Sequence, residues 1–164
     1  MIQDAIRAAK LDPDLYNAVE HDRSYTWRAL VLVLIVSAAS GIGSAIGLEG
    51  VSRIEGPVTD TITGVIGWVL WSASAAFIGT RLFAGTTDLG EMLRVLGYAQ
   101  APRIIGIIPL LGPVGWAWAL VAGVVAVREG QEVTTGKAAV VVVTGGSVVV
   151  VLNWLAALVF GRLL

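Results

Sequence analysis

Four stretches without a charged residue dominate the hydrophobic pattern of this chain, and they cover residues 29–48, 61–80, 104–127 and 138–161. A helix needs roughly 20 apolar residues, at about 1.5 Å of rise each, to cross the hydrocarbon core of a bilayer. Each stretch is about that long. A soluble protein with such apolar helices would need polar sequence to cover them, and the rest of this chain is too short for that. The pattern therefore predicts an integral membrane protein built of helices.

Prolines, glycines and charged residues divide the apolar sequence into five predicted spans. We therefore expect an all-α bundle of about five transmembrane helices. The last span is rich in valine, but an open strand edge is not viable in lipid, so a helix is expected there too. The predicted spans are residues 27–47, 61–83, 91–111, 114–127 and 138–160.

The third and fourth spans are short and are broken by proline and glycine. We expect the third to kink or restart at Pro102, and a tight turn at Gly112-Pro113 to lead into the fourth. A helix of about 14 residues rises only some 21 Å, which is less than the roughly 30 Å core. The two segments are therefore either spans of a thin membrane region or a re-entrant hairpin. Both alternatives end on the side where they began.

Residues 1–26 form a short segment of mixed charge before the first span, and we expect it to be cytosolic and amphipathic. Asp12 followed by Pro13 is a favourable N-cap and first-turn pair for a short helix through Glu20. Helices of this kind often lie on the lipid interface beside a membrane domain. The segment lacks the basic-then-apolar pattern of a cleaved signal peptide.

Composition agrees with a membrane protein, because 56% of the residues are hydrophobic and only 14% are charged. A soluble domain carries about a quarter charged residues. The net charge of -1 and the lack of a basic patch give no reason to expect a nucleic-acid partner. The chain has no cysteine, which excludes disulfides, thiol chemistry and cysteine-bound zinc or iron–sulfur sites.

Lysine and arginine set the orientation in the membrane, because they concentrate in cytoplasmic loops. Five passages with a cytoplasmic N-terminus leave nine of the 11 basic residues on the cytoplasmic side and only Arg53 and Arg162 outside. We therefore expect a multi-pass protein of the cell membrane with its C-terminus outside. A single passage over residues 102–127 would move Arg128 and Lys137 outside and weaken this bias.

Residues for intramembrane catalysis are missing from the predicted spans. The only histidine, His21, lies before the first span, and neither Ser44 nor Ser74 has a histidine or lysine in a span to activate it. No acid lies in a predicted span except Glu91, the first residue of the third, and no phosphate-binding loop, metal-binding motif or dinucleotide turn is present. We expect no catalytic residue, no metal and no cofactor.

Small residues crowd the predicted spans, and they allow helix backbones to approach closely in lipid. An asparagine within a span can also hydrogen-bond between helices. The candidate packing residues are Gly41, Gly43 and Gly47 in the first span, with Gly145, Gly146 and Asn153 in the last.

Arg103 is the most informative charge, because an ionisable side chain within a membrane is costly and is often functional. Its side chain could reach the cytoplasmic headgroups along its apolar stem. Alternatively it has a fixed partner, for which Glu91 and Asp88 are the candidates. Tryptophans form a separate group at the expected membrane interfaces, in which we place Trp27, Trp116 and Trp118.

A short motif resembles that of a known family. The run Leu-Arg-Val-Leu-Gly-Tyr-Ala-Gln-Ala-Pro at residues 93–102 is similar to the Gly-Tyr-x-x-x-Pro signature of the Yip family, the Ypt/Rab-interacting membrane proteins and their prokaryotic relatives. The motif residues are Gly97, Tyr98 and Pro102. Residues 11–31 are similar to the start of the first span in prokaryotic members, and residues 116–128 resemble their fourth helix.

The resemblance implies a membrane domain of about five spans over residues 27–164, with a cytosolic N-terminus. Eukaryotic members are linked to Rab GTPases, vesicle traffic and membrane shaping. This chain lacks their long cytosolic N-terminal region, so a GTPase partner is not expected. The resemblance brings no catalytic residue.

Two functional hypotheses follow. The first is a non-enzymatic membrane-organising or scaffold protein in the lipid bilayer, which acts through helix–helix association with itself or another membrane protein. Its small-residue faces motivate this hypothesis. The second is a small membrane transporter or channel with a site at the broken third and fourth helices, and it predicts a polar cavity at mid-membrane.

Overall fold

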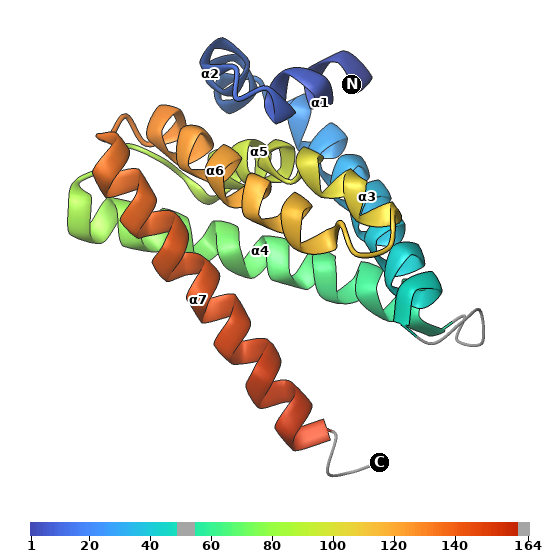
Figure 1. Ribbon diagram of the computed structural model, residues 1–164. Helices are drawn as coiled ribbons and strands as arrows, with labels where there is room; N and C mark the ends of the chain where they lie inside the picture. Colours follow the sequence, from blue (N-terminus) through green and yellow to red (C-terminus); the bar gives the residue numbers. More distant parts are fainter. Residues whose placement is uncertain (49–54, 161–164) are drawn as a thin grey trace.

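The computed structural model describes residues 1–48 and 55–160, and every regular element in these ranges is a helix. The all-α prediction is confirmed for this part of the chain (Figure 1). The helices are α1 (Ile2–Ala9), α2 (Pro13–His21), α3 (Tyr25–Leu48), α4 (Glu55–Phe83), α5 (Leu89–Ala99), the 3-10 helix η1 (Ala101–Ile107), α6 (Gly112–Gly130) and α7 (Thr135–Phe160).

Three helices are long and apolar enough to cross a membrane. Their qualifying segments are Tyr25–Ile46 in α3, Pro57–Phe83 in α4 and Thr135–Leu152 in α7. They lie where the hydrophobic pattern predicts the first, second and last spans. Many of their apolar side chains remain exposed in the isolated chain, as expected for helices whose outer faces contact lipid.

The third predicted span, residues 91–111, consists of two elements, and the break between them lies at Pro102, where a kink or restart was expected. The capping box of Asp88 and Glu91 starts α5, which ends at Ala99. Proline disfavours the α conformation in the residue before it and has no N–H to donate, so the chain tightens into η1 around Pro102.

The fourth predicted span is longer than the sequence indicates, because α6 has 19 residues and is not confined to 114–127. Gly112 and Pro113 begin this helix, although the sequence analysis assigned them to a turn. Proline fits the first helical turn, where its missing N–H leaves no hydrogen bond unmade. The turn itself lies at residues 108–111.

The third and fourth segments form a hairpin, α5–η1 followed by α6, that packs against α3 (Figure 1). η1 lies along the far half of α3, where a Cβ on Gly43 would be 1.8 Å from the Gly106 carbonyl oxygen. α7 crosses α4, and Trp71 Nε1 donates to the Val142 carbonyl at 3.2 Å. The second half of α7 runs away from the bundle (Figure 1).

Residues 1–22, here called the N-terminal platform, pack on α5 and α6. Its apolar side chains Leu15, Tyr16 and Val19 are buried within the protein. The predicted cap is confirmed, since the Asp12 carboxylate accepts from the Asp14 N–H at 3.1 Å. α2 therefore turns its apolar face to the protein, which differs from a helix lying freely on the lipid interface.

Two side chains of the hairpin fasten the platform. Arg94 is buried, and its Nε donates to the carbonyls of Val19 and Glu20 at 3.1 Å each. These carbonyls belong to the last turn of α2, where a cation also complements the helix dipole. Trp118 Nε1 donates to the Ala9 carbonyl at 2.8 Å.

Candidate functional site

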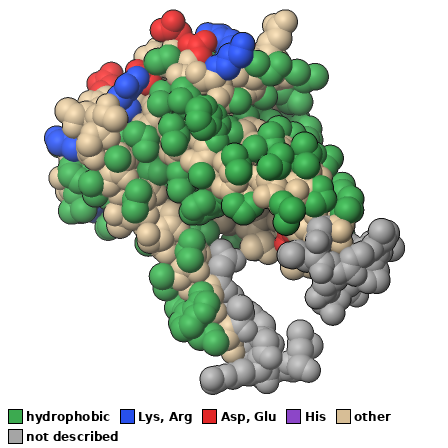
Figure 2. All heavy atoms as spheres, in the orientation of Figure 1, with side chains coloured by type: hydrophobic (Ala, Val, Ile, Leu, Met, Phe, Trp, Pro, Cys, Tyr) green, Lys and Arg blue, Asp and Glu red, His purple; other side chains and the backbone are tan. Residues whose placement is uncertain are grey.

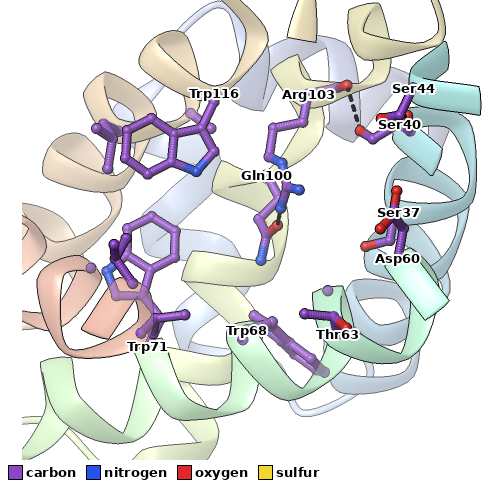
Figure 3. Close-up of a pocket in the computed structure, with 17 residues that line it drawn as sticks. Ser37, Ser40, Ser44, Asp60, Thr63, Trp68, Trp71, Gln100, Arg103 and Trp116 are labelled. Carbon is purple, nitrogen blue, oxygen red and sulfur yellow. Dashed lines mark hydrogen bonds between the residues drawn. The ribbon is translucent and has the colours of Figure 1, made fainter. Parts of the chain in front are cut away.

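The change from α to 3-10 geometry at Pro102 aligns two polar side chains. A 3-10 helix has three residues per turn, so residues three apart lie directly above one another. Gln100 and Arg103 have this spacing, and Arg103 Nη1 donates to Gln100 Oε1. Both side chains extend into a cavity, which Figure 3 shows.

The cavity has a volume of about 440 Å³ and lies between α3, α4, η1, α6 and α7. Glycine, alanine, valine, leucine and tryptophan supply much of its wall. Arg103 and Gln100 extend toward the middle of the view in Figure 3, with Ser37 and Asp60 on one side and Trp116 and Trp71 on the other. Its polar lining is Ser37, Ser40 and Ser44 of α3, Asp60 and Thr63 of α4, and Gln100 and Arg103 of the hairpin.

The polar residues that line the cavity differ in their exposure to solvent. Ser44 and Asp60 are exposed, Arg103 is half-buried, and Gln100 and Ser37 are 2% and 1% exposed. The open end therefore lies where α3 ends and α4 begins. The Ser37 hydroxyl has no hydrogen-bond partner among the described residues, so it can bind a polar group within the cavity.

The Arg103 side chain turns onto Gln100 within the bundle. Its position relative to the cytoplasmic headgroups stays a prediction. The prediction that Glu91 or Asp88 pairs with it is wrong. Those two residues cap α5. The Asp88 N–H donates to the Glu91 carboxylate and the Glu91 N–H donates to the Asp88 carboxylate, each at 2.8 Å.

Asp60 is the carboxylate whose field acts on Arg103, although the described residues form no ion pair with this arginine. Asp60 lies just before the second predicted span, residues 61–83, which begins too late. In the structure α4 begins at Glu55, and Asp60 lies inside a segment able to span a membrane. Pro57 sits in the first turn of this helix, where proline is tolerated.

The predicted packing glycines of α3 contact their own chain. A Cβ on Gly41 would lie 2.8 Å from the Pro57 Cα and 3.0 Å from the Asp60 Cβ. Gly43 lies against the Gly106 carbonyl, as described above. The surroundings of Gly47 lie outside the described residues.

The glycines of α7 also face the protein. A Cβ on Gly145 would be 3.2 Å from Trp71 Cδ1, and one on Gly146 would be 3.8 Å from Trp71 Nε1. Gly146 also forms part of the cavity wall. The side chain of Asn153 lies outside the described residues.

The motif residues Gly97, Tyr98 and Pro102 have distinct places in this architecture. A Cβ on Gly97 would be 2.8 Å from the Ala29 Cβ, so glycine allows α5 to approach α3 closely. The buried Tyr98 ring packs edge-on against Tyr25 at a centroid distance of 5.6 Å. Pro102 ends the α-helical geometry and begins the segment that carries Arg103.

Sequence reasoning missed Asp60, Gln100 and Arg94. The spacing of Gln100 and Arg103 around Pro102 was a usable signal, because it equals one 3-10 turn. The three tryptophans expected at interfaces also differ among themselves. Trp27 is 68% exposed, Trp116 is at the cavity, and Trp118 holds the platform.

Comparison with known proteins supports one assignment. Searches of the curated proteins and of the solved structures find no significant match. The family model of the Yip1 domain matches residues 12–160, which covers α2 of the platform, the whole α5–η1–α6 hairpin and the cavity. The chain therefore belongs to the Yip1 domain family of membrane proteins.

Proposed function

We propose that this protein binds a small polar or amphipathic molecule in the cavity beside Arg103, as a small membrane transporter or binding protein does, without enzymatic chemistry. One observation carries the proposal: a guanidinium group from a broken helix faces a largely apolar cavity with a cluster of polar side chains, and it has no ion-pair partner among the described residues. A charge at membrane depth is costly to retain, and such charges commonly mark substrate or ion pathways.

The cavity depends on the helix break. Irregular backbone at membrane depth is tolerated where it lines a cavity. Broken helices also form the binding sites of many secondary transporters. η1 combines both features, because its 3-10 turn presents Gln100 and Arg103 to the cavity.

Copurification tests this proposal directly. The protein is purified in a mild detergent, and the molecules bound to it are extracted and identified by mass spectrometry. We expect a bound molecule with the wild type and its loss with Arg103→Gln. Arg81→Gln is the matched control, since Arg81 is exposed and lies over the Phe77 ring. Equal retention by Arg103→Gln would contradict the proposal.

Cysteine labelling tests whether water reaches the cavity, because the chain contains no cysteine. Ser40→Cys lies on the cavity wall, whereas Ser72→Cys is buried away from it. We expect a membrane-impermeant thiol reagent added outside to modify the first and spare the second. Protection of both cysteines would show a dry interior and defeat the proposal.

The topology we propose has five passages, with the N-terminus in the cytoplasm and the C-terminus outside the cell membrane. α5 and η1 together reach about 30 Å, which is the thickness of a hydrocarbon core. The hairpin thus has the length of two passages. Charged side chains also gather over the end that carries the platform (Figure 2). Impermeant reagent should label Thr59→Cys from outside and spare Arg128→Cys, and the reverse would refute this topology.

A scaffold role is the second candidate, and α7 favours it. The described candidate packing glycines, Gly41, Gly43, Gly145 and Gly146, contact their own chain, so a partner would need another surface. The second half of α7 offers one, because Val150, Val151 and Trp154 are 55%, 53% and 63% exposed. Oxidation of Trp154→Cys in native membranes would crosslink two copies if α7 mediates self-association. Val141→Cys is the buried control.

A further inference from the structure

Two opposite charges reach the same cavity without forming an ion pair. Arg103 extends from η1 and Asp60 from α4, and Figure 3 shows both at the polar side of the cavity. Both side chains line this cavity, yet no ion pair joins them. Opposite charges in a region of low dielectric attract strongly, so separate placement leaves each one able to bind a ligand group.

The two charges together restrict the class of ligand. An anion bound at Arg103 would be repelled by Asp60, and a cation bound at Asp60 would be repelled by Arg103. A molecule that carries both charges satisfies both side chains. From this geometry, and resting on the proposed function, we propose that the cavity binds a zwitterion with an anionic group at Arg103 and an ammonium group at Asp60.

Neighbouring polar groups fit this division. The Gln100 side-chain oxygen accepts from the Arg103 guanidinium, so the amide N–H groups of Gln100 can donate to an anion. Ser37 lines the cavity and is 1% exposed. Its hydroxyl has no hydrogen-bond partner among the described residues, so it can accept a hydrogen bond from an ammonium group. Each end of the ligand thus has a charged and a neutral contact.

The apolar wall allows two sources for such a ligand. Trp116, Leu120 and Val150 also line the cavity and can contact a hydrocarbon portion. The zwitterion is therefore either the ethanolamine phosphate headgroup of a membrane lipid or a free amino acid. Both share the chemistry of an ammonium group linked to an anion.

The lining itself provides a binding signal, because Trp68, Trp71 and Trp116 belong to it. Purified protein in detergent is titrated with glycerophosphoethanolamine, which joins both charges, and separately with glycerol 3-phosphate and with ethanolamine. Leucine serves as the free amino acid. We expect a tryptophan fluorescence change with a zwitterion, and binding of each single-charge probe weaker by about tenfold to a hundredfold.

Two variants that each remove one charge separate the zwitterion from a simple anion. Asp60→Asn and Arg103→Gln should each weaken zwitterion binding by about tenfold to a hundredfold. Asp60→Asn should at the same time strengthen glycerol 3-phosphate binding, because the repulsion is gone. Asp14→Asn, exposed on α2 and far from the cavity, should change neither. Circular dichroism of each variant verifies that the helices remain.

The source is decided in nanodiscs by native mass spectrometry. Retention of phosphatidylethanolamine over phosphatidylglycerol, lost in both cavity variants, assigns a lipid headgroup. A leucine response without lipid retention assigns a free amino acid.

The inference and the proposed function fail in different ways. Tight binding of glycerol 3-phosphate, with zwitterion binding unaffected by Asp60→Asn, would overturn the zwitterion and leave the cavity as an anion site. No response to any probe would also overturn the inference. A wild-type protein that copurifies with no molecule would overturn the proposed function as well.

Discussion

Two arginines of the same hairpin, nine positions apart, have opposite environments. Arg94 is buried against the N-terminal platform, where it donates to two carbonyls of α2. Arg103 faces the cavity, where its described hydrogen bond is to Gln100. Arg94 thus joins the hairpin to the platform through backbone acceptors. Arg103 is the arginine that we propose binds a ligand.

The largest expected effect comes from removing Arg94. Arg94→Ala leaves the last carbonyls of α2 without their donor in a buried place, so it should cost about 2–4 kcal/mol of stability and release the platform. Arg103→Ala should cost about 1 kcal/mol or less, because it removes one side-chain hydrogen bond. Unfolding in a graded detergent mixture measures both, and limited proteolysis detects release of residues 1–22. Equal losses of stability from the two variants would contradict the different roles assigned to Arg94 and Arg103.

A methyl group at Gly43 tests the packing beside the cavity. Gly43→Ala should cost about 1–3 kcal/mol, because the new Cβ would overlap the Gly106 carbonyl and push η1 away from α3. Gly136→Ala is the control, since nothing lies within 4 Å of a Cβ there. A helical Gly→Ala change in open space should stabilise slightly, by about 0.5–1 kcal/mol. If both variants melt alike, η1 does not pack as described.

Two buried tyrosines, Tyr16 and Tyr98, allow a similar comparison between a hydrogen-bonded and an unpartnered group, because Tyr→Phe removes only the hydroxyl. The Tyr16 hydroxyl donates to the Ala8 carbonyl at 3.1 Å, whereas the buried Tyr98 hydroxyl has no described partner. Tyr16→Phe should therefore cost about 1 kcal/mol, and Tyr98→Phe should be neutral or stabilising. Thermal unfolding of the two variants in one detergent makes the comparison. A larger loss from Tyr98→Phe would show that its hydroxyl binds a group at that place.

The smallest effect is a pH dependence of the platform. Burial raises the pKa of the Glu20 carboxyl above its ordinary value of 4.5, against the opposing fields of His21 and Arg94 and with those of Glu91 and Glu132. The folded state thus favours the protonated form. Its contribution is fully present below the ordinary pKa and is lost as pH rises through the raised one. Glu20→Gln should remove this loss, so its melting temperature should fall less than that of the wild type between pH 4 and pH 8.

The comparison also shows what the sequence could predict. The apolar stretches located α3, α4 and α7, and Asp12-Pro13 located the start of α2, because these signals act over one helix or one turn. The 3-10 geometry of the chain after Pro102 was harder to predict, because it accompanies packing against α3. Gly43 and Ser40 of α3 meet η1 there, which no local pattern reports. Asp60 was missed for the same reason, since its place in a helix follows from the packing of Pro57 on Gly41.

The contrast between the arginines was also beyond the sequence. Arg94 sits in an ordinary helical pattern, and its partners are backbone carbonyls about 75 positions earlier. Backbone acceptors leave no trace in residue identity. Arg103 attracted attention because it follows a proline in an apolar run, and the structure gives it a cavity in place of the expected carboxylate.

The 3-10 geometry of η1 also affects how far the hairpin extends along α3. The seven residues of η1 rise about 14 Å, against about 10 Å for the same residues in an α-helix. The tip of the hairpin therefore reaches about 4 Å farther along α3 than an unbroken helix would. Hydrophobic mismatch of a few ångströms is enough to sort proteins among bilayers of different thickness. In the five-passage topology that we propose, Pro102 therefore helps to set which bilayer thickness this protein matches without tilting or deforming the lipid around it.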